Sequence, residues 1–272
     1  MGKFDNIAIL TDLDKTFLTD DSKTVVRNIE AIEYFKREGG LFSLATGRMH
    51  FNLDVIVPNV DKLVNAPAVM CNGTYFYDFQ KKKVFCETFM DAFLAYKAVQ
   101  FVHNLGTDTF IRACDRNGYL VDSVDKRAAK QLIGYGINTF VSLPYKDWNS
   151  ESYYKVVFED KAETLVEVQR KLEAEFPRVF EYNRSRPTLL EVQMRGINKS
   201  ILLDSFKGLY AEQGRDIVLY VCGDNENDIE MLKKADVAVC PSNAIDEVKA
   251  ISDMCLCSNN DGVIAELIYK LE

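Results

Sequence analysis

Short apolar runs alternate with amphipathic segments toward both ends of this chain, and that alternation limits the folds it can adopt. Residues 7–10 and 41–45 have the length of buried strands, and residues 24–38 between them carry apolar side chains at near-helical spacing. The helical pattern stops at Gly39-Gly40, which is typical of a helix end. Strand, helix and strand in this order predict right-handed βαβ units around a parallel sheet. We therefore expect an α/β fold.

The middle of the chain has a different pattern. Residues 110–114 and 119–121 flank the sequence Asp-Arg-Asn-Gly, whose Asn-Gly pair is typical of a β-hairpin. Helix-like segments and further strand-like runs surround this hairpin. We therefore expect a small α+β domain over residues 84–189. It would interrupt an α/β core formed by residues 1–83 and 190–272.

The composition of the chain disfavours several kinds of partner, cofactor site and cellular location. The 272 residues carry a formal net charge of −8 and a pI near 5, which disfavours nucleic acid as a partner. No window approaches the roughly 20 apolar residues of a membrane-spanning helix, and the first residues do not resemble a signal peptide. The 7 cysteines are scattered and odd in number, and 2 histidines are too few for a histidine-rich metal site. We expect a reduced, soluble, cytoplasmic protein that is a monomer or a homodimer.

Polar side chains follow several of the apolar runs directly. Asp12, Thr46, Asn72 and Asp224 each come at or just after the end of a predicted strand. Because the carboxyl ends of parallel strands meet at one edge of a sheet, we expect these residues at a common rim, where open α/β sheets bind ligands. An Asp-x-Asp pair alone is a weak signal, since acidic residues often cap helices. A solvated capping pair would not explain why Asp12 follows a wholly apolar run.

Asp12 and Asp14 occupy alternate positions of an extended segment, so both side chains can face one pocket. Asp12 can attack phosphorus as a carboxylate nucleophile. Asp14 can protonate the departing alkoxide and then deprotonate the water that hydrolyses the aspartyl phosphate. Together with the other residues of the predicted site, the pair predicts phosphoryl transfer through an aspartyl intermediate.

The predicted site holds more negative charge than a phosphate would tolerate. The carboxylates of Asp12, Asp14, Asp224 and Asp228 would repel a phosphate dianion unless cations neutralised them. Mg²⁺ prefers oxygen ligands, and we expect Asp12 and Asp224 to hold it. Lys199 is the natural second cation. The alternative for Lys199 is a surface lysine at a helix start, where a positive charge is mildly unfavourable.

Other polar groups complete the predicted phosphate site. Thr46 offers a hydroxyl and its backbone amide at a strand-to-helix turn, next to Gly47, although a plain capping threonine is the alternative. Asn227 could orient Asp228 or reach the substrate, and Gly223 permits close backbone approach. The predicted substrate-binding residues are Thr46, Gly47, Asn72, Lys199 and Asn227.

Together these motifs resemble the haloacid dehalogenase-like superfamily of phosphatases, and most closely its Cof-type group with the larger α/β cap. The order and the gaps match over essentially the whole chain. Residues 84–189 fall between the second and third motifs, where this group carries its cap. The matching segments are Asp12-x-Asp14-x-Thr16, Leu44-Ala45-Thr46-Gly47-Arg48, Asn72-Gly73, Lys199, Gly223-Asp224-x-x-Asn227-Asp228 and Asp261-Gly262-Val263.

The resemblance implies a Rossmann-like core, dependence on Mg²⁺, and hydrolysis of small phosphate monoesters such as sugar phosphates or phosphorylated cofactors. The implied roles are Asp12 as nucleophile, Asp14 as acid and base, Thr46 and Lys199 as phosphoryl-binding groups, Asp12, the backbone carbonyl of Asp14 and Asp224 as metal ligands, and Asp228 as a further ligand or a support of the metal's water shell. One departure is Lys15, where the group usually has glycine. A lysine there adds charge beside the pocket and restricts the backbone, but it removes no reacting group.

Two other functions remain open. A phosphosugar mutase would pass the phosphoryl group from Asp12 to another sugar hydroxyl and not to water. A non-catalytic protein that binds phosphorylated metabolites would keep the fold, although every motif here retains its reactive side chains. We expect residues 84–189 to select the substrate. Within them, Arg184 and Arg186 would either meet an anionic substrate or form a solvated basic turn.

Overall fold

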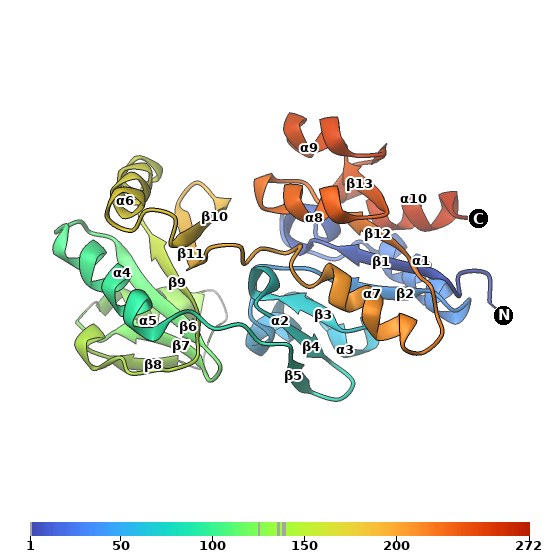
Figure 1. The fold of residues 1–272 in the computed structure, drawn as a ribbon. Helices are drawn as coiled ribbons and strands as arrows, with labels where there is room; N and C mark the ends of the chain where they lie inside the picture. The colour runs from blue at the N-terminus through green and yellow to red at the C-terminus, as the bar shows by residue number, and fades with distance from the viewer. Residues whose placement is uncertain (1, 125, 135–136, 138–139) are drawn as a thin grey trace. The chain divides into compact units, whose positions relative to one another are not determined.

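The computed structural model describes residues 2–124, 126–134, 137 and 140–272. The chain forms two compact units. One comprises Met1–Glu87 and Asn198–Glu272, and the other comprises Thr88–Ile197. Each unit has its own main sheet (Figure 1). Each unit also has its own hydrophobic core.

The main sheet of the first unit has five parallel strands in the order β14-β13-β12-β1-β2. Its strands are β1 (Ile7–Thr11), β2 (Leu41–Leu44), β12 (Val218–Cys222), β13 (Val237–Pro241) and β14 (Met254–Leu256). β1 pairs with both β12 and β2, and Thr11 at its end lies opposite Cys222 and Leu44. This register brings the segments that follow these three strands to one edge of the sheet (Figure 1). The predicted α/β fold with a Rossmann-like parallel-sheet core is confirmed.

Seven α-helices belong to the described part of the first unit, and α1 lies within the segment of residues 24–38 that was predicted to be helical. They are α1 (Val26–Arg37), α2 (Leu53–Ile56), α3 (Val60–Leu63), α7 (Leu203–Ala211), α8 (Ile229–Lys234), α9 (Asp246–Ile251) and α10 (Val263–Lys270). α1 buries Ala31, Ile32 and Phe35 and packs against β2 and α10, as the near-helical spacing of its apolar residues requires. In the part of the chain that the structure describes, no helix is both long enough and apolar enough to cross a bilayer.

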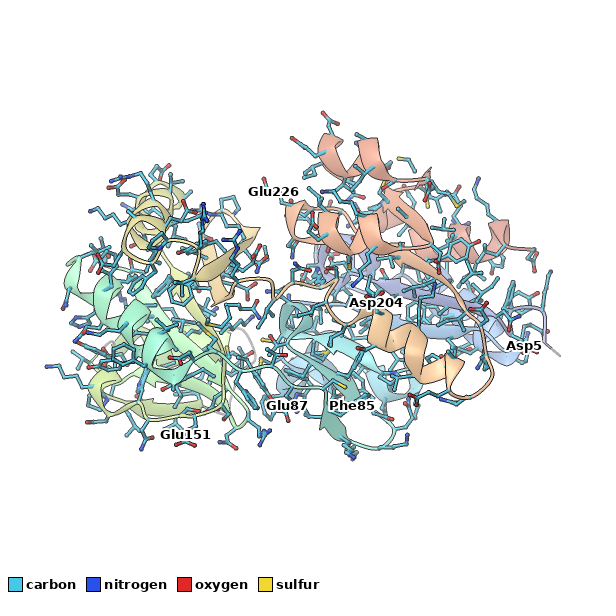
Figure 2. All side chains as sticks on the ribbon, in the orientation of Figure 1. Asp5, Phe85, Glu87, Glu151, Asp204 and Glu226 are labelled. Atoms are coloured by element: carbon cyan, nitrogen blue, oxygen red, sulfur yellow. The ribbon has the colours of Figure 1, made fainter. Side chains whose placement is uncertain are left out.

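A small antiparallel sheet extends the first unit. It consists of β3 (Ala68–Met70), β4 (Tyr75–Asp78) and β5 (Lys83–Phe85), and a bridge between Ala45 and Val69 joins it to the chain that leaves β2. Phe85, which is labelled in Figure 2, lies on β5. Its ring stacks on that of Phe76 on β4, with centroids 5.2 Å apart. β5 therefore belongs to the first unit, whereas the sequence placed the start of the insertion at residue 84.

The second unit is an α+β domain with a six-stranded sheet in the order β10-β11-β9-β6-β7-β8. Its elements are α4 (Ala92–Asn104), β6 (Phe110–Asp115), β7 (Gly118–Asp122), α5 (Lys126–Gly134), β8 (Phe140–Leu143), β9 (Tyr153–Glu159), α6 (Ala162–Glu175), β10 (Phe180–Arg186) and β11 (Leu189–Met194). β6 and β7 form the predicted hairpin. β11 pairs with β9 and β10, so this unit continues past residue 189 to Ile197.

His50 is the one histidine of the first unit, and it is half-buried among aromatic rings. Its ring stacks on Tyr77 with centroids 4.1 Å apart, and its Nδ1 lies 2.9 Å from the hydroxyl of Tyr75. Burial lowers the pKa of His50 to about 4, against a weaker opposing effect of Glu87. His50 is therefore neutral in the folded protein at neutral pH.

This lowered pKa predicts a pH-dependent loss of stability. The contribution of His50 is fully present above its unfolded pKa near 6.5 and is lost as the pH falls toward its folded pKa of about 4, because only the unfolded state then binds a proton. We expect the wild type to lose about 1–2 kcal/mol more unfolding free energy than His50→Gln between roughly pH 7 and pH 5. Urea unfolding at a series of pH values measures this. Parallel pH profiles for the two proteins would contradict the prediction.

Candidate active site

The ends of β1 and β12 bring the predicted nucleophile and the predicted acidic loop together. Asp12 follows β1 directly, and its backbone N–H donates to the carbonyl of Cys222 at 2.8 Å. Asp224 comes two residues after Cys222. Because β1 and β12 are parallel neighbours in register, both carboxylates lie at the same edge of the sheet. This is the arrangement that the positions of these residues after apolar runs predicted.

Lys199 is the centre of a buried charge cluster. Its Nζ donates to Asp12 Oδ1 at 2.5 Å and to Asp228 Oδ1 at 2.6 Å. The side chains of Lys199 and Asp228 are 1% and 0% exposed, so neither charge is solvated. Burial acts to lower the pKa of Lys199, but the adjacent Asp12 and Asp228 outweigh it and raise the pKa. Lys199 therefore stays charged, and it lies in a turn before α7 and not at the helix start that the alternative interpretation assumed.

One ammonium group does not neutralise the carboxylates around it. Burial raises the pKa of Asp12 well above its usual range, and the neighbouring Asp228 and Asp224 add to this effect. Burial together with Asp228 raises the pKa of Asp224 to about 6. In the protein without a cation, the cluster of Asp12, Asp224 and Asp228 thus holds negative charge that the surroundings do not compensate.

The free oxygens of this cluster fit a hard divalent cation. Ligand oxygens of Asp12, Asp224 and Asp228 lie within 4.8 Å of one another. Asp228 Oδ1 accepts from Lys199, and its Oδ2 accepts from the backbone N–H groups of Asp224 and Asn225 at 2.9 and 3.1 Å. Among the described residues, the Oδ2 atoms of Asp12 and Asp224 accept no hydrogen bond. The donor set therefore fits Mg²⁺ at Asp12 and Asp224, with Asp228 in a supporting position.

Thr16 holds Asp224 in place, which sequence reasoning did not foresee. Its Oγ1 donates to Asp224 Oδ1 at 2.8 Å, and both side chains are buried. Thr16 lies in the short helical turn η1 (Leu13–Phe17) directly after Asp12. The only sequence signal was its place in the Asp-x-Asp-x-Thr motif, because the hydrogen bond joins residues 208 positions apart.

Two glycines allow the loops of the site to approach each other. A Cβ on Gly223 would lie 2.5 Å from the Cβ of Asp228, so a side chain there would displace the acidic loop. Gly73 has φ +90°, and a Cβ on it would lie 2.0 Å from the carbonyl oxygen of Asn198. Asn198 immediately precedes Lys199, so the loop at Gly73 packs against the segment that positions the lysine.

Thr46 and Asn72 lie where expected, but Thr46 does not offer its amide. The N–H of Thr46 donates to the carbonyl of Val69 at 2.9 Å, so the prediction that this amide binds phosphate is wrong. The Thr46 hydroxyl accepts the N–H of Arg48 at 3.2 Å and remains available to donate. Asn72 is buried with a left-handed backbone (φ 54°), and its N–H donates to the carbonyl of Thr46 at 3.0 Å.

Gly47 and Asn227 are more peripheral. Gly47 is half-buried in the bend after Thr46. Asn227 is half-buried in the short helix η5 (Glu226–Asp228), between the exposed Glu226 and the buried Asp228. Figure 2 labels Glu226. The structure thus brings Asp12, Lys199, Asp224 and Asp228 into direct contact and places the other predicted residues around them.

Asp14 is separate from the buried cluster, because Arg48 holds it. Arg48 Nη2 donates to Asp14 Oδ1 at 2.6 Å and Arg48 Nε to Asp14 Oδ2 at 2.9 Å, a bidentate pair. The two side chains are 33% and 41% exposed, whereas that of Asp12 is 8% exposed. Sequence reasoning assigned Arg48 to a motif but gave it no role. The Thr-Gly-Arg triplet at a strand end was the available signal.

Comparisons with known proteins show which family this chain belongs to. The sequence profile of the haloacid dehalogenase-like hydrolases matches residues 9–268. The chain belongs to this family. Over 273 residues it is 26% identical to the pyridoxal phosphate phosphatase YbhA of Escherichia coli, covering 96% of this chain and 97% of that protein. It is 21% identical to the 5-amino-6-(5-phospho-D-ribitylamino)uracil phosphatase YitU of Bacillus subtilis, with 96% of each chain covered.

The fold of the hydrolase is also found in solved structures. The subclass IIB sugar phosphatase BT4131 superposes with a TM-score of 0.80 at 19% identity, covering 98% of this chain and 100% of that chain. At this identity the likeness shows the fold alone. The predicted membership of the haloacid dehalogenase-like group, with a Rossmann-like core and a cap domain, is confirmed.

Lys15 has a backbone conformation that is unusual for a residue with a side chain. Its backbone is left-handed, with φ 63° and ψ 6°, a conformation that glycine adopts without strain. Its carbonyl accepts a hydrogen bond from Asn243 Nδ2 at 2.9 Å. Lys15 is exposed, and its charge acts to lower the pKa of Asp224. The residue therefore contributes positive charge beside the acidic cluster at the cost of backbone strain.

The bidentate pair predicts that Arg48 positions Asp14 in this hydrolase. Arg48→Gln removes the guanidinium group that orients the Asp14 carboxylate. We expect kcat to fall about ten-fold or more, which is a part of the rate enhancement that a general acid and base supplies. Arg48→Lys can donate to only one oxygen and should restore part of the loss. Steady-state kinetics with an aryl phosphate measures both variants. Equal rates for wild type and Arg48→Gln would contradict a positioning role.

Proposed function

We propose that this hydrolase is a Mg²⁺-dependent phosphatase that forms an aspartyl phosphate on Asp12. The observation that carries the proposal is the buried cluster at the ends of β1 and β12. There the Asp12 carboxylate bonds to Lys199 at 2.5 Å and lies beside Asp224 and Asp228. A buried carboxylate paired with a cation, next to spare oxygen ligands, is suited to attack a phosphoryl group.

The proposed metal ligands are Asp12, the backbone carbonyl of Asp14 and Asp224. When bound, Mg²⁺ would neutralise the charge of a phosphoryl group and act as a Lewis acid toward it. Asp228 would support this arrangement by holding Lys199 and the backbone of the acidic loop, since both of its oxygens accept hydrogen bonds.

The chain's own groups account for both chemical steps. In the first, an Asp12 oxygen forms a bond to phosphorus while the bond from phosphorus to the ester oxygen breaks, and Asp14 gives its proton to the departing alkoxide. In the second, Asp14 takes a proton from water, the water oxygen attacks phosphorus, and Asp12 leaves as a carboxylate. Arg48 holds the Asp14 carboxylate in place for these proton transfers through the bidentate pair.

The phosphoryl oxygens require donors around the nucleophile. We assign this role to the Thr46 hydroxyl and to Lys199, with Gly47, Asn72 and Asn227 nearby. Lys199 has a third N–H beyond those bonded to Asp12 and Asp228. These donors would stabilise the charge that develops on the phosphoryl oxygens.

The proposed substrates are small phosphorylated metabolites. YbhA acts on pyridoxal phosphate and YitU on a phosphorylated ribitylaminouracil, according to their names. Each of these two substrates is a phosphate monoester of a small polar molecule. Because the core site is built around the phosphoryl group, we assign the choice among such molecules to the second unit. Within this unit Arg184 Nε donates to Gln169 at 3.1 Å and Arg186 pairs with Glu159 at 2.7 Å, so we assign neither a contact with the substrate.

Phosphate release tests the proposal directly. The purified protein should release phosphate from an aryl phosphate and from some members of a panel of sugar and cofactor phosphates. The activity should disappear with EDTA and return when Mg²⁺ is added in excess. Interconversion of phosphosugar isomers without phosphate release would favour a mutase. Full activity in EDTA would contradict the proposed metal dependence.

A further inference from the structure

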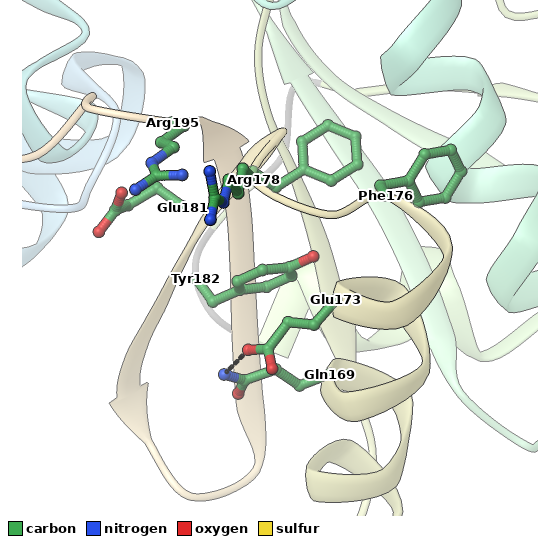
Figure 3. Close-up of a pocket in the computed structure, with 8 residues that line it drawn as sticks. Gln169, Glu173, Phe176, Arg178, Glu181, Tyr182 and Arg195 are labelled. Atoms are coloured by element: carbon green, nitrogen blue, oxygen red, sulfur yellow. Dashed lines mark hydrogen bonds between the residues drawn. The ribbon is translucent and has the colours of Figure 1, made fainter.

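A cavity of about 370 Å³ lies in the second unit, between α6 and the hairpin of β10 and β11 (Figure 3). Its lining combines positive, negative and aromatic side chains from three segments of the chain. None of these residues has a role in the proposed phosphoryl transfer. The volume is within the range of sites that hold small organic molecules.

Two arginines at this cavity have no acidic partner. Arg178 and Arg195 both line it, and Figure 3 shows their guanidinium groups toward the same end. Within the described residues, neither forms an ion pair at the 4.0 Å limit. A hydrogen bond from the Arg195 N–H to the carbonyl of Val179, 3.0 Å long, fixes Arg195 beside the start of β10. Two guanidinium groups on one cavity repel each other, and an anion between them would relieve the repulsion.

The backbone of Arg178 points to the same conclusion. Its φ of 64° lies in the left-handed region, which costs free energy in any residue except glycine. Glycine at this position would relieve the strain but would supply no guanidinium. The chain instead keeps a long cationic side chain in a strained turn at the cavity.

The aromatic wall of the cavity contains an unused donor. Phe176 and Phe180 contact edge to face with centroids 5.4 Å apart, and Phe180 and Tyr182 do so at 6.4 Å. The Tyr182 hydroxyl is buried and has no hydrogen-bond partner among the described residues. Burial, together with the nearby Glu173, raises the pKa of Tyr182, so the hydroxyl keeps its proton. A buried hydroxyl without a partner is costly unless a ligand supplies one.

We propose that this cavity binds a small organic carboxylate with a flat apolar body. The carboxylate lies at Arg178 and Arg195, the body lies against the aromatic wall, and a hydroxyl of the ligand meets Tyr182 and Glu173. Glu173 and Glu181 also line the cavity, so a monoanion at the two arginines leaves less uncompensated negative charge than a phosphate dianion would. The cavity is lined only by residues of the second unit, and its proposed binding role does not depend on the proposed phosphatase activity.

The probe is 3-(4-hydroxyphenyl)propionate, which has a carboxylate, a flat ring and a hydroxyl. Its neutral amide, 3-(4-hydroxyphenyl)propanamide, serves as the matched ligand. Binding of both to the full-length protein is measured by saturation-transfer NMR. We expect the wild type to prefer the carboxylate by about ten-fold, as charge-assisted hydrogen bonds do over neutral ones. Absence of saturable carboxylate binding at millimolar concentration would overturn the proposal.

Two variants separate binding from folding. Arg178→Gly combined with Arg195→Gln should remove the preference for the carboxylate, while relief of strain at position 178 keeps the melting temperature at or above that of the wild type. Tyr182→Phe should weaken both probes about three-fold or more and leave stability unchanged or higher, since the hydroxyl bonds to nothing in the protein. A double variant that still prefers the carboxylate would overturn the proposal.

A matched control removes the same charge elsewhere. Arg170→Gln combined with Lys171→Gln deletes two cations from the exposed side of α6, where both pair with Glu167 and neither lines the cavity. This variant should keep the ten-fold preference for the carboxylate. Loss of the preference here would show that net charge, and not the cavity, attracts the probe, and would also overturn the proposal.

Discussion

Replacing Asp12 with asparagine should lower the rate of phosphate release by a factor on the order of 10⁴ or more, because the variant has no carboxylate to attack phosphorus. The fold should survive. Burial raises the pKa of Asp12, so its negative charge is unfavourable in the folded protein when no metal ion is bound. A neutral amide of the same shape therefore leaves the stability of the metal-free protein unchanged or higher. Steady-state rates and melting temperatures, both measured on the same preparation, check this pair of expectations.

The matched control for Asp12→Asn is Asp246→Asn on α9. The side chain of Asp246 is 101% exposed, and it lies at the 4.0 Å limit of an ion pair with Lys249. This variant should retain wild-type activity and stability, because exposed ion pairs contribute little. If Asp12→Asn kept more than about a tenth of the wild-type rate, a nucleophilic role for Asp12 would be untenable, since loss of such a group costs far more.

Replacing Lys199 with methionine should destabilise the metal-free protein by about 3–5 kcal/mol, because it leaves buried carboxylates without their cation. Methionine has a similar length, so the loss reflects charge more than volume. At about 2–4 °C per kcal/mol, the melting temperature should fall by roughly 10 °C. The variant should also lose most of its phosphatase activity, since Lys199 is a proposed phosphoryl ligand. Urea unfolding in EDTA measures the change in stability.

Lys207→Met provides the comparison. Lys207 on α7 forms an ion pair with Asp236 at 2.7 Å, but both side chains are more than a third exposed, at 36% and 37%. This variant should lose no more than about 1 kcal/mol, because water screens and replaces the exposed pair. Equal losses of unfolding free energy for the two lysine variants would contradict the prediction, because they would mean that burial does not strengthen the ion pairs of Lys199.

The arrangement of the core followed from local pattern. Strand-length apolar runs and helical spacing predicted the parallel sheet, and a parallel sheet places the carboxyl ends of its strands at one edge. The prediction that Asp12 and Asp224 meet rested on that rule alone. The contact of Lys199 with Asp12 agrees with the expectation of a second cation at this site.

The extent of the inserted domain was not readable in the same way. The sequence placed it at residues 84–189, whereas the compact unit spans Thr88–Ile197. In the sequence, β5 and β11 are short strand-like runs close to the predicted domain boundaries. Strand pairing decides which unit each of them belongs to. β5 is hydrogen-bonded to β4 of the first unit, and β11 is hydrogen-bonded to β9 and β10 of the second. Pairing partners are a tertiary property that the strand pattern does not specify.

The sequence by itself determined the fold class, the family and the residues that meet at the end of β1, because apolar periodicity and motif spacing depend on near neighbours in the chain. Only the tertiary structure showed that Arg48 holds Asp14, that Thr16 holds Asp224 and that the Thr46 amide is already bonded to Val69. The physical reason is that a hydrogen bond depends on where two groups lie in space, and packing decides this between residues as far apart as Thr16 and Asp224.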